Sequence, residues 1–111
     1  MTVTSERSGD IVIVHAGPPR LIHPSLSEFS NSAAGALKDG TRKLVIDLSQ
    51  VEYLDSAAIG CLMDLYRQAT HAGATLKLAA VHPRVETILT LVGANQFMEI
   101  YPDAAAAVKS F

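Results

Sequence analysis

The hydrophobic residues of this chain follow two spacings, and each spacing predicts a different kind of element. Apolar or β-branched runs at residues 11–14 and 75–80 predict buried strands. Residues 2–7 alternate weakly, as an edge strand does, and the Ser-Gly-Asp sequence that follows is typical of a turn between two strands. Residues 43–48 form an apolar run interrupted by Asp47, which is typical of a central strand covered on both faces. A short last strand is expected at residues 97–101.

Apolar residues at intervals of three and four predict helices between these strands. The expected helices cover residues 24–38, 56–72, 83–92 and 102–111. Pro83 suits the first turn of its helix, where a missing N–H costs nothing, and Gly40, Gly73 and Gly93 are natural stops. The expected buried stripes are Leu26, Phe29, Ala33, Ala36 and Leu37 in the first helix, Ile59, Leu62, Met63, Tyr66 and Ala69 in the second, and Val85, Ile88, Leu89 and Val92 in the third.

The order of the expected elements is β-β-α-β-α-β-α-β-α. From the third strand onward, strands alternate with helices, which favours an α/β fold with a mixed sheet of four or five strands and about four helices packed on it. A chain of 111 residues suits one domain and is too short for two, so residues 1–111 are expected to form a single domain.

A serine stands at the most informative junction of the chain. Residues 44–49 predict a buried strand, residues 50–54 a short connector and residues 55–60 the start of a helix. A serine at such a start can cap the helix by accepting a bond from a free backbone N–H. It can also carry a phosphate, because the exposed N–H groups and the positive end of the helix dipole favour an anion. Ser56 is therefore either a structural cap or a switch.

Composition narrows the classes of function. Hydrophobic residues make up 49% of the chain and charged residues 18%, so the chain can bury a core. The formal net charge of -2 offers no basic face for nucleic acid or for an anionic membrane. Cys61 is the only cysteine, which excludes an internal disulfide. The first residues lack the apolar run of a signal peptide, and no apolar stretch reaches the roughly 20 residues that would cross a bilayer. A soluble cytoplasmic domain is expected.

The residues capable of chemistry form no clear catalytic or metal-binding pattern. Asp47 and Asp55 could act as a carboxylate pair in acid–base catalysis, but Asp47 is expected to make structural bonds at a strand end. The four histidines, His15, His23, His71 and His82, lack metal-ligand spacing, and the one before Pro83 is expected to cap a helix. No glycine-rich loop indicates a nucleotide site. We therefore expect no enzymatic activity, no metal and no cofactor.

The sequence Asp55-Ser56-Ala57-Ala58-Ile59-Gly60 resembles the STAS domain family, and within it the stand-alone anti-sigma factor antagonists of bacteria. The usual form there is Asp-Ser-Ser/Thr-Gly-Leu-Gly. Residues 44–54, 72–78 and 83–97 also fit the family's pattern of strands, connectors and helices, and the resemblance covers about residues 10–108. It is the order and spacing of these segments together that make the resemblance specific.

The resemblance implies a phosphorylation switch at Ser56. In that family the serine after the motif's aspartate is phosphorylated by a partner kinase of the GHKL type, which is also the anti-sigma factor, and a PP2C-type phosphatase removes the phosphate. The dephosphorylated domain binds the kinase and frees the sigma factor. A phosphate carries about −1.5 to −2 charges at neutral pH, so it would oppose an acidic or apolar partner surface without unfolding the domain.

The chain departs from the family pattern near the expected partner surface. Ala57 replaces a Ser or Thr, Ala58 replaces a Gly, and Arg20 lies near the position of the acid in a Gly-x-Leu-Asp signature. A charge reversal at a recognition surface usually blocks one partner and favours another. The expected partner surface comprises Asp55, Ser56, Ala57, Ala58, Ile59 and Gly60 together with Arg20 and His23. The alternative implied by the resemblance is a constitutive adaptor in a signalling scaffold or a transporter complex, without phosphorylation; the oligomeric state stays open.

Overall fold

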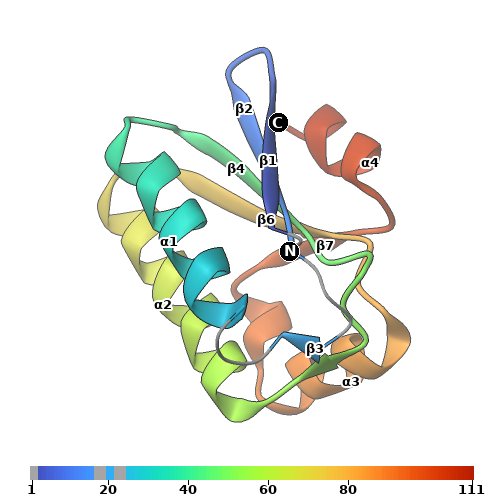
Figure 1. Cartoon of the computed structure of the whole chain (residues 1–111). Coiled ribbons are helices and arrows are strands. Elements are labelled where there is room, and N and C mark those ends of the chain that lie inside the picture. The colour runs from blue at the N-terminus through green and yellow to red at the C-terminus, as the bar shows by residue number, and fades with distance from the viewer. Residues whose placement is uncertain (1–2, 17–19, 22–24) are drawn as a thin grey trace.

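The computed structural model describes residues 3–16, 20–21 and 25–111 (Figure 1). Within these residues a five-stranded sheet has the order β1-β2-β4-β6-β7. The strand β1 pairs antiparallel with β2, and the other neighbours in this sheet are parallel. The strands of this sheet are β1 (Thr4–Ser8), β2 (Ile11–His15), β4 (Lys43–Asp47), β6 (Thr75–Ala79) and β7 (Glu99–Tyr101). The mixed α/β fold expected from the sequence is confirmed.

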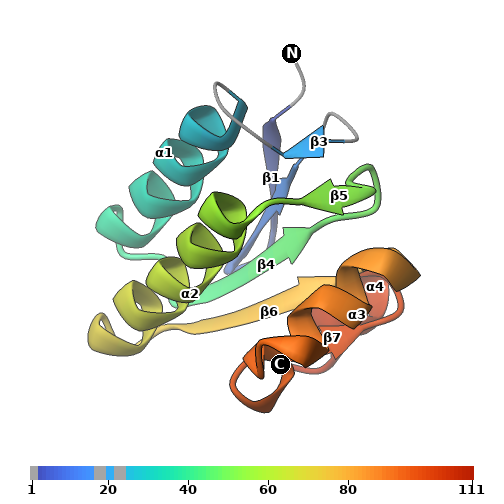
Figure 2. The same cartoon turned by 90° about the horizontal axis from the view of Figure 1, so that it is seen from below.

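The helices lie on both faces of this sheet, as Figures 1 and 2 show. They are α1 (Ser25–Lys38), α2 (Ser56–His71), α3 (Pro83–Leu91) and the short α4 (Ala104–Lys109), with a 3₁₀ turn η1 (Ala94–Gln96) after α3. Because successive side chains of a strand point to opposite faces, each strand contributes to two apolar layers. The larger layer joins alternate residues of β2, β4 and β6 to α1, α2 and α3. The smaller layer joins the other residues of these strands to α4.

The central strand shows why the sheet is stable. Leu44, Val45 and Ile46 have no exposed surface, since one face of β4 packs on the three-helix layer and the other on α4. Full burial of one such side chain stabilises a fold by about 1.5–3 kcal/mol relative to leaving it in water. The continuous apolar run in this segment is therefore explained by burial on both faces, as the sequence predicted.

Two short strands were not expected from the sequence. They are β3 (Arg20–Leu21) and β5 (Tyr53–Leu54), which pair in parallel and form a separate two-stranded sheet. The segment with the Gly-Pro-Pro sequence, residues 17–19, lies outside the described residues, as do residues 1–2 and 22–24. The small sheet lies at the same end of the molecule as the start of α2 (Figure 1).

Two expectations about the third helix and the last strand were wrong. Val92 was expected in the buried stripe of α3, but it is the C-cap residue and is 52% exposed. The helix ends because Gly93 adopts a positive φ of 78°, a left-handed conformation that turns the chain away. Phe97 was expected to begin the last strand, but it follows η1 and is also largely exposed.

Candidate functional site

The residue before Ser56, not Ser56 itself, caps the helix. Asp55 has extended backbone angles (φ −93°, ψ 178°), and its carboxylate accepts the backbone N–H of Ala58 at 2.8 Å. Ser56 is the first residue of α2. Of the two roles that the sequence left open for this serine, the structure assigns the cap to its neighbour, because an N-cap residue must be non-helical while its side chain bonds to the third residue of the helix.

The start of α2 combines an exposed hydroxyl with unused backbone donors. Ser56 and Ala57 are both exposed, and no side-chain hydrogen bond of Ser56 is found in the part of the chain that the structure describes. In the same part, no acceptor is seen for the backbone N–H groups of Ser56 and Ala57, and the first turn of α2 holds no acidic residue. The positive end of the helix dipole therefore faces solvent beside the hydroxyl.

The remaining residues of the motif divide between core and surface. Ala58 is completely buried in the three-helix layer, so its side chain cannot contact a partner of the folded domain. Ile59 is half-buried, and Gly60 is exposed. Adding a Cβ at Gly60 would meet no atom within 4 Å, so the space above this residue is open. The accessible part of the motif is thus Asp55 to Ala57 together with Ile59 and Gly60.

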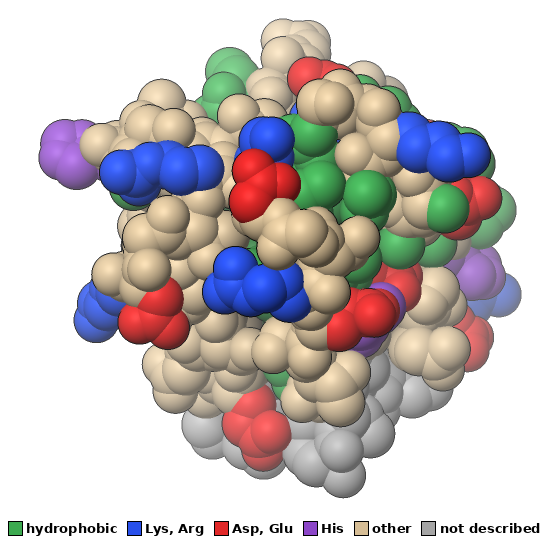
Figure 3. All heavy atoms as spheres, turned by 90° about the horizontal axis from the view of Figure 1, so that it is seen from above, with side chains coloured by type: hydrophobic (Ala, Val, Ile, Leu, Met, Phe, Trp, Pro, Cys, Tyr) green, Lys and Arg blue, Asp and Glu red, His purple; other side chains and the backbone are tan. Residues whose placement is uncertain are grey.

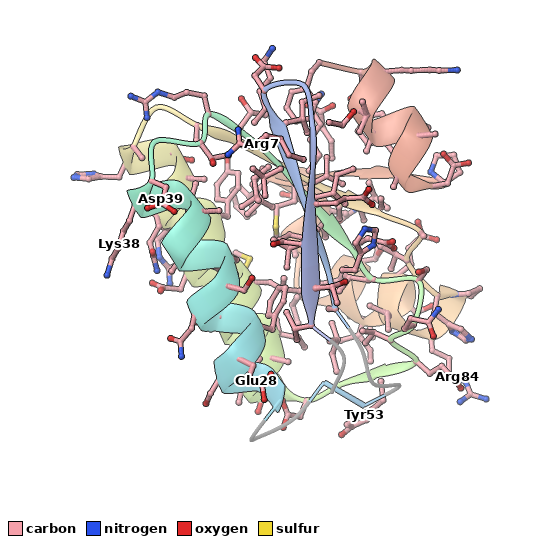
Figure 4. The ribbon with its side chains drawn as sticks, turned by 45° about the horizontal axis from the view of Figure 1, so that its top comes forward. Arg7, Glu28, Lys38, Asp39, Tyr53 and Arg84 are labelled. Carbon is pink, nitrogen blue, oxygen red and sulfur yellow. The ribbon has the colours of Figure 1, made fainter. Side chains whose placement is uncertain are left out.

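The small sheet brings a second segment of the chain to this end of the molecule. Arg20 is in register with Tyr53, three residues before Ser56. Tyr53 is 42% exposed, and Figure 4 shows it pointing outward, with Glu28 of α1 to one side and Arg84 of α3 to the other. Only the backbone of Arg20 is described, and His23 lies outside the described residues. The structure thus places Arg20 on a strand beside the connector.

The two aspartates of the supposed catalytic pair have separate structural roles. Asp47 ends β4, where one carboxylate oxygen accepts the N–H of Ser49 at 2.9 Å and the other contacts the ring of His15 at 2.6 Å. Asp55 bonds to the start of α2. The prediction that Asp47 makes structural bonds at a strand end is confirmed. His82 also acts as predicted, because its ring Nδ1 accepts the backbone N–H of Arg84 at 3.2 Å.

Comparison with known families identifies this architecture. The family model described as the STAS domain matches residues 2–107. The chain belongs to the STAS domain family. A Thermotoga neapolitana protein named as an anti-sigma factor antagonist is 26% identical over 73 residues, which cover 66% of this chain. The chain therefore spans 65% of the length of that curated relative.

Solved structures share the fold at low sequence identity. The crystal structure of an anti-sigma factor antagonist from Thermotoga maritima superposes with a TM-score of 0.86 and 22% identity, over 97% of this chain and 92% of that one. The phosphorylated form of SpoIIAA, a cell fate determinant of Bacillus, superposes with a TM-score of 0.76 and 14% identity, over 98% of this chain and 99% of that one. At these identities the likeness to the two structures shows the fold alone.

Within this STAS domain no described group of three or more His, Cys, Asp or Glu side chains is placed to hold a metal ion. A hollow of about 430 Å³ lies between β1 and α1, lined by residues that include Arg7, Asn31 and Asp39. Figure 4 shows Arg7 and Asp39 at the end of the molecule opposite Tyr53, so this hollow is remote from the Ser56 turn. Among the described helices, none has the length and apolar character needed to span a bilayer.

Two features of the STAS domain escaped the sequence reasoning. Tyr53 is an exposed aromatic beside the Ser56 turn, and its place in the connector just before the motif was the signal that could have assigned it to the site. His15 contacts both Glu6 and Asp47, residues that are 9 and 32 positions away. No local motif joins these three residues, since their contact depends on the strand order and register.

Proposed function

We propose that this STAS domain is a regulatory protein of the anti-sigma factor antagonist type, switched by reversible phosphorylation of Ser56. The observation that supports the proposal best is that Asp55, and not Ser56, caps α2. Ser56 is exposed, and it is not required for the helix to begin because Asp55 provides the cap. A hydroxyl that the fold does not need for capping can be modified at little cost to the fold.

The physical surroundings of the hydroxyl favour a phosphate. A phosphate on Ser56 would lie beside the N–H groups of Ser56 and Ala57 and at the positive end of a helix of 16 residues. These groups would partly compensate its charge. The carboxylate of Asp55 lies next to it and would add to the negative potential outside the protein. The domain would therefore stay folded while its surface becomes strongly anionic.

The proposed partner surface consists of Ser56, Ala57, Ile59 and Gly60, bordered by Asp55. We include the strand of Arg20 in this surface, and His23, which lies outside the described residues, stays a proposed partner residue. Because Ala57 is exposed and Ile59 is half-buried, the unmodified surface around Ser56 is weakly polar and can pack against an apolar partner surface. A phosphate at its centre would have to be desolvated on binding, which is costly unless the partner supplies cations. The proposed partners are a GHKL-type serine kinase that is also the anti-sigma factor and a PP2C-type phosphatase.

The first test is the modification state of the protein isolated from its native host. Intact mass with peptide mapping, across growth and stress conditions, should find a single phosphate on Ser56 under at least one condition. A chain that is never modified would overturn the switch and leave the constitutive adaptor in a signalling scaffold or transporter complex as the better interpretation. For a constitutive adaptor, partner binding would not depend on Ser56.

A binding experiment tests the consequence of the charge. Binding of the proposed GHKL-type kinase of the native host should persist in Ser56→Ala and weaken at least tenfold in Ser56→Asp. Ser8→Asp is the matched control, because Ser8 is an exposed serine next to the β1–β2 turn, at the end of the molecule opposite the start of α2 (Figure 1). Equal binding by Ser56→Asp and the parent would contradict the proposal.

A further inference from the structure

Three ionisable side chains from three different strands meet on the sheet face that α4 covers in part. His15 at the end of β2 places Nδ1 2.6 Å from a carboxylate oxygen of Asp47 on β4 and Nε2 2.5 Å from a carboxylate oxygen of Glu6 on β1. His15 and Asp47 are partners in the parallel register. The ring thus links the edge strand, its neighbour and the central strand.

The geometry favours a doubly protonated ring. A neutral imidazole has one N–H and one lone pair, so it can donate to only one of two carboxylates. The other contact would then set a lone pair against an anionic oxygen. With both carboxyl groups ionised, the contacts of 2.5 and 2.6 Å are both hydrogen bonds only if the ring of His15 carries both protons and a positive charge.

The surroundings stabilise this charge. Partial burial disfavours the charged ring, but the bonds and negative charges of Glu6 and Asp47 outweigh it and raise the pKa of His15 above its ordinary value. The side chain of Asp47 is 11% exposed, against 60% for Glu6. Loss of the ring proton would leave a mostly buried carboxylate without its cation.

The two lysines on this face are engaged elsewhere. On β4, Lys43 pairs with Asp10 of the β1–β2 turn at 3.1 Å. On β6, Lys77 donates to Ser110 after α4 and lies 3.7 Å from Glu99 of β7. Tyr101 of β7 bonds to Glu99, Asp103 caps α4, and Lys109 lies in the last turn of α4. Glu52 is an exposed acid in the connector after β4. Within the described residues, no lysine or arginine forms an ion pair with Glu6 or Asp47.

The edge strand depends on this contact more than the inner strands do. All five residues of β1 are exposed, so their side chains add little burial to the hydrogen-bonded ladder with β2. Val3, just before the strand, is partly buried against the core. Among the charged residues of β1, Glu6 is bonded to the inner sheet through His15. Segments with few buried contacts are the ones that open locally.

We propose that Glu6, His15 and Asp47 form a pH-sensitive latch, which holds β1 on the sheet while the ring of His15 is protonated and loosens β1 once the proton is lost. A group whose pKa is raised in the folded state stabilises that state fully below its unfolded-state pKa, about 6.5 for histidine. The contribution disappears as the pH rises through the higher folded-state pKa. The latch therefore opens on the alkaline side of its titration, independently of Ser56.

An NMR titration tests the charge state of the ring. The midpoint of His15 should lie above the ordinary histidine value of about 6.5, and Glu6→Gln should lower it. Glu28→Gln is the matched control, because Glu28 is an exposed acid on α1. A midpoint of His15 at or below about 6.5, the ordinary value for histidine, would overturn the proposal.

Amide hydrogen exchange tests the opening itself. After correction for intrinsic exchange rates, protection of the β1–β2 amides should fall across the titration of His15 while the β4–β6 amides stay protected. Each pH unit between the pKa values of the closed and open states corresponds to about a tenfold change in the opening equilibrium. In Glu6→Gln the β1–β2 protection should be lower at acidic pH and nearly independent of pH. Protection in the parent that does not change across the titration would refute the latch.

Discussion

Two helices of this domain begin with the same chemistry and differ in what surrounds it. Asp55 caps α2 by accepting the N–H of Ala58 at 2.8 Å, and Asp103 caps α4 by accepting the N–H of Ala106 at 2.7 Å. Both aspartates have extended backbone angles, and both are followed by small residues. The local signal that begins a helix is therefore used twice in one chain.

The helices α2 and α4 differ in their first residue. In α2 it is the exposed Ser56, and in α4 it is Ala104, which packs against the smaller apolar layer. Because α4 begins with alanine after the same cap, a hydroxyl at this position is not a structural requirement for a helix start. Ser56 therefore has no capping role to explain it, which is the reason to look for a function.

The helices also differ in how firmly they are held. The helix α2 has 16 residues and buries Ala58, Leu62, Leu65 and Ala69 in the larger layer. The helix α4 has 6 residues, of which Ala107 is fully buried, and the smaller layer beneath it contains fewer large side chains. Figure 3, a view from above Figure 1, shows hydrophobic side chains visible at the surface between acidic and basic ones. The proposed modification site at the start of α2 thus belongs to the longer helix, which buries more side chains.

The largest expected effect comes from placing a larger side chain at the third residue of each helix. Ala58→Leu should lower the free energy of unfolding by about 1–3 kcal/mol, because this alanine is fully buried and the added atoms have no space. Ala106→Leu should cost less, since Ala106 is only half-buried. Urea unfolding of both variants measures the difference. Equal losses would mean that the two helices are packed equally tightly.

Removal of the caps should have the next largest effect. Asp55→Ala should destabilise the domain by about 1 kcal/mol, the usual cost of losing an N-cap side chain. Asp55→Asn is the control that retains the acceptor and should recover most of this loss. Asp103→Ala should affect the global transition less, because a helix of 6 residues can fray without unfolding the core. Chemical denaturation monitored by circular dichroism would reveal the order, and a neutral Asp55→Ala would contradict the assignment of the cap.

The sequence was a good guide where an element is long enough to show a period. The bounds of the strand β4 and the helix α2 were predicted closely, because each is long enough to show its period. Of the buried stripe expected in α2, only Leu62 and Ala69 are fully buried. The strands β3 and β5 have two residues each, too few to show any alternation. They exist because Arg20 and Tyr53 meet across more than thirty residues of chain, which is a property of the tertiary fold.

The candidate site was predicted in composition but not in detail. Asp55 and Ser56 are both good N-cap residues, and the choice between them depends on which has an extended backbone. Val92 satisfies the helical spacing of α3 but falls at its C-cap, where the chain already leaves the helix. The contact of His15 with two carboxylates could not be predicted, because it needs the sheet order and register as well as the sequence.

The smallest expected change in the free energy of unfolding, that of Ser56→Ala, is the most informative for the comparison of the two helix starts. Ser56→Ala should change the free energy of unfolding by less than about 0.5 kcal/mol, since the side chain is exposed and the cap stays in place. Ala57→Ser is the reciprocal control, which adds a hydroxyl at the next exposed position and should be equally neutral. The double variant Ser56→Ala/Ala57→Ser moves the hydroxyl by one residue and keeps the composition of the turn. If Ser56→Ala alone cost as much as Asp55→Ala, the serine would be part of the cap, and its exposure would no longer argue for a switch.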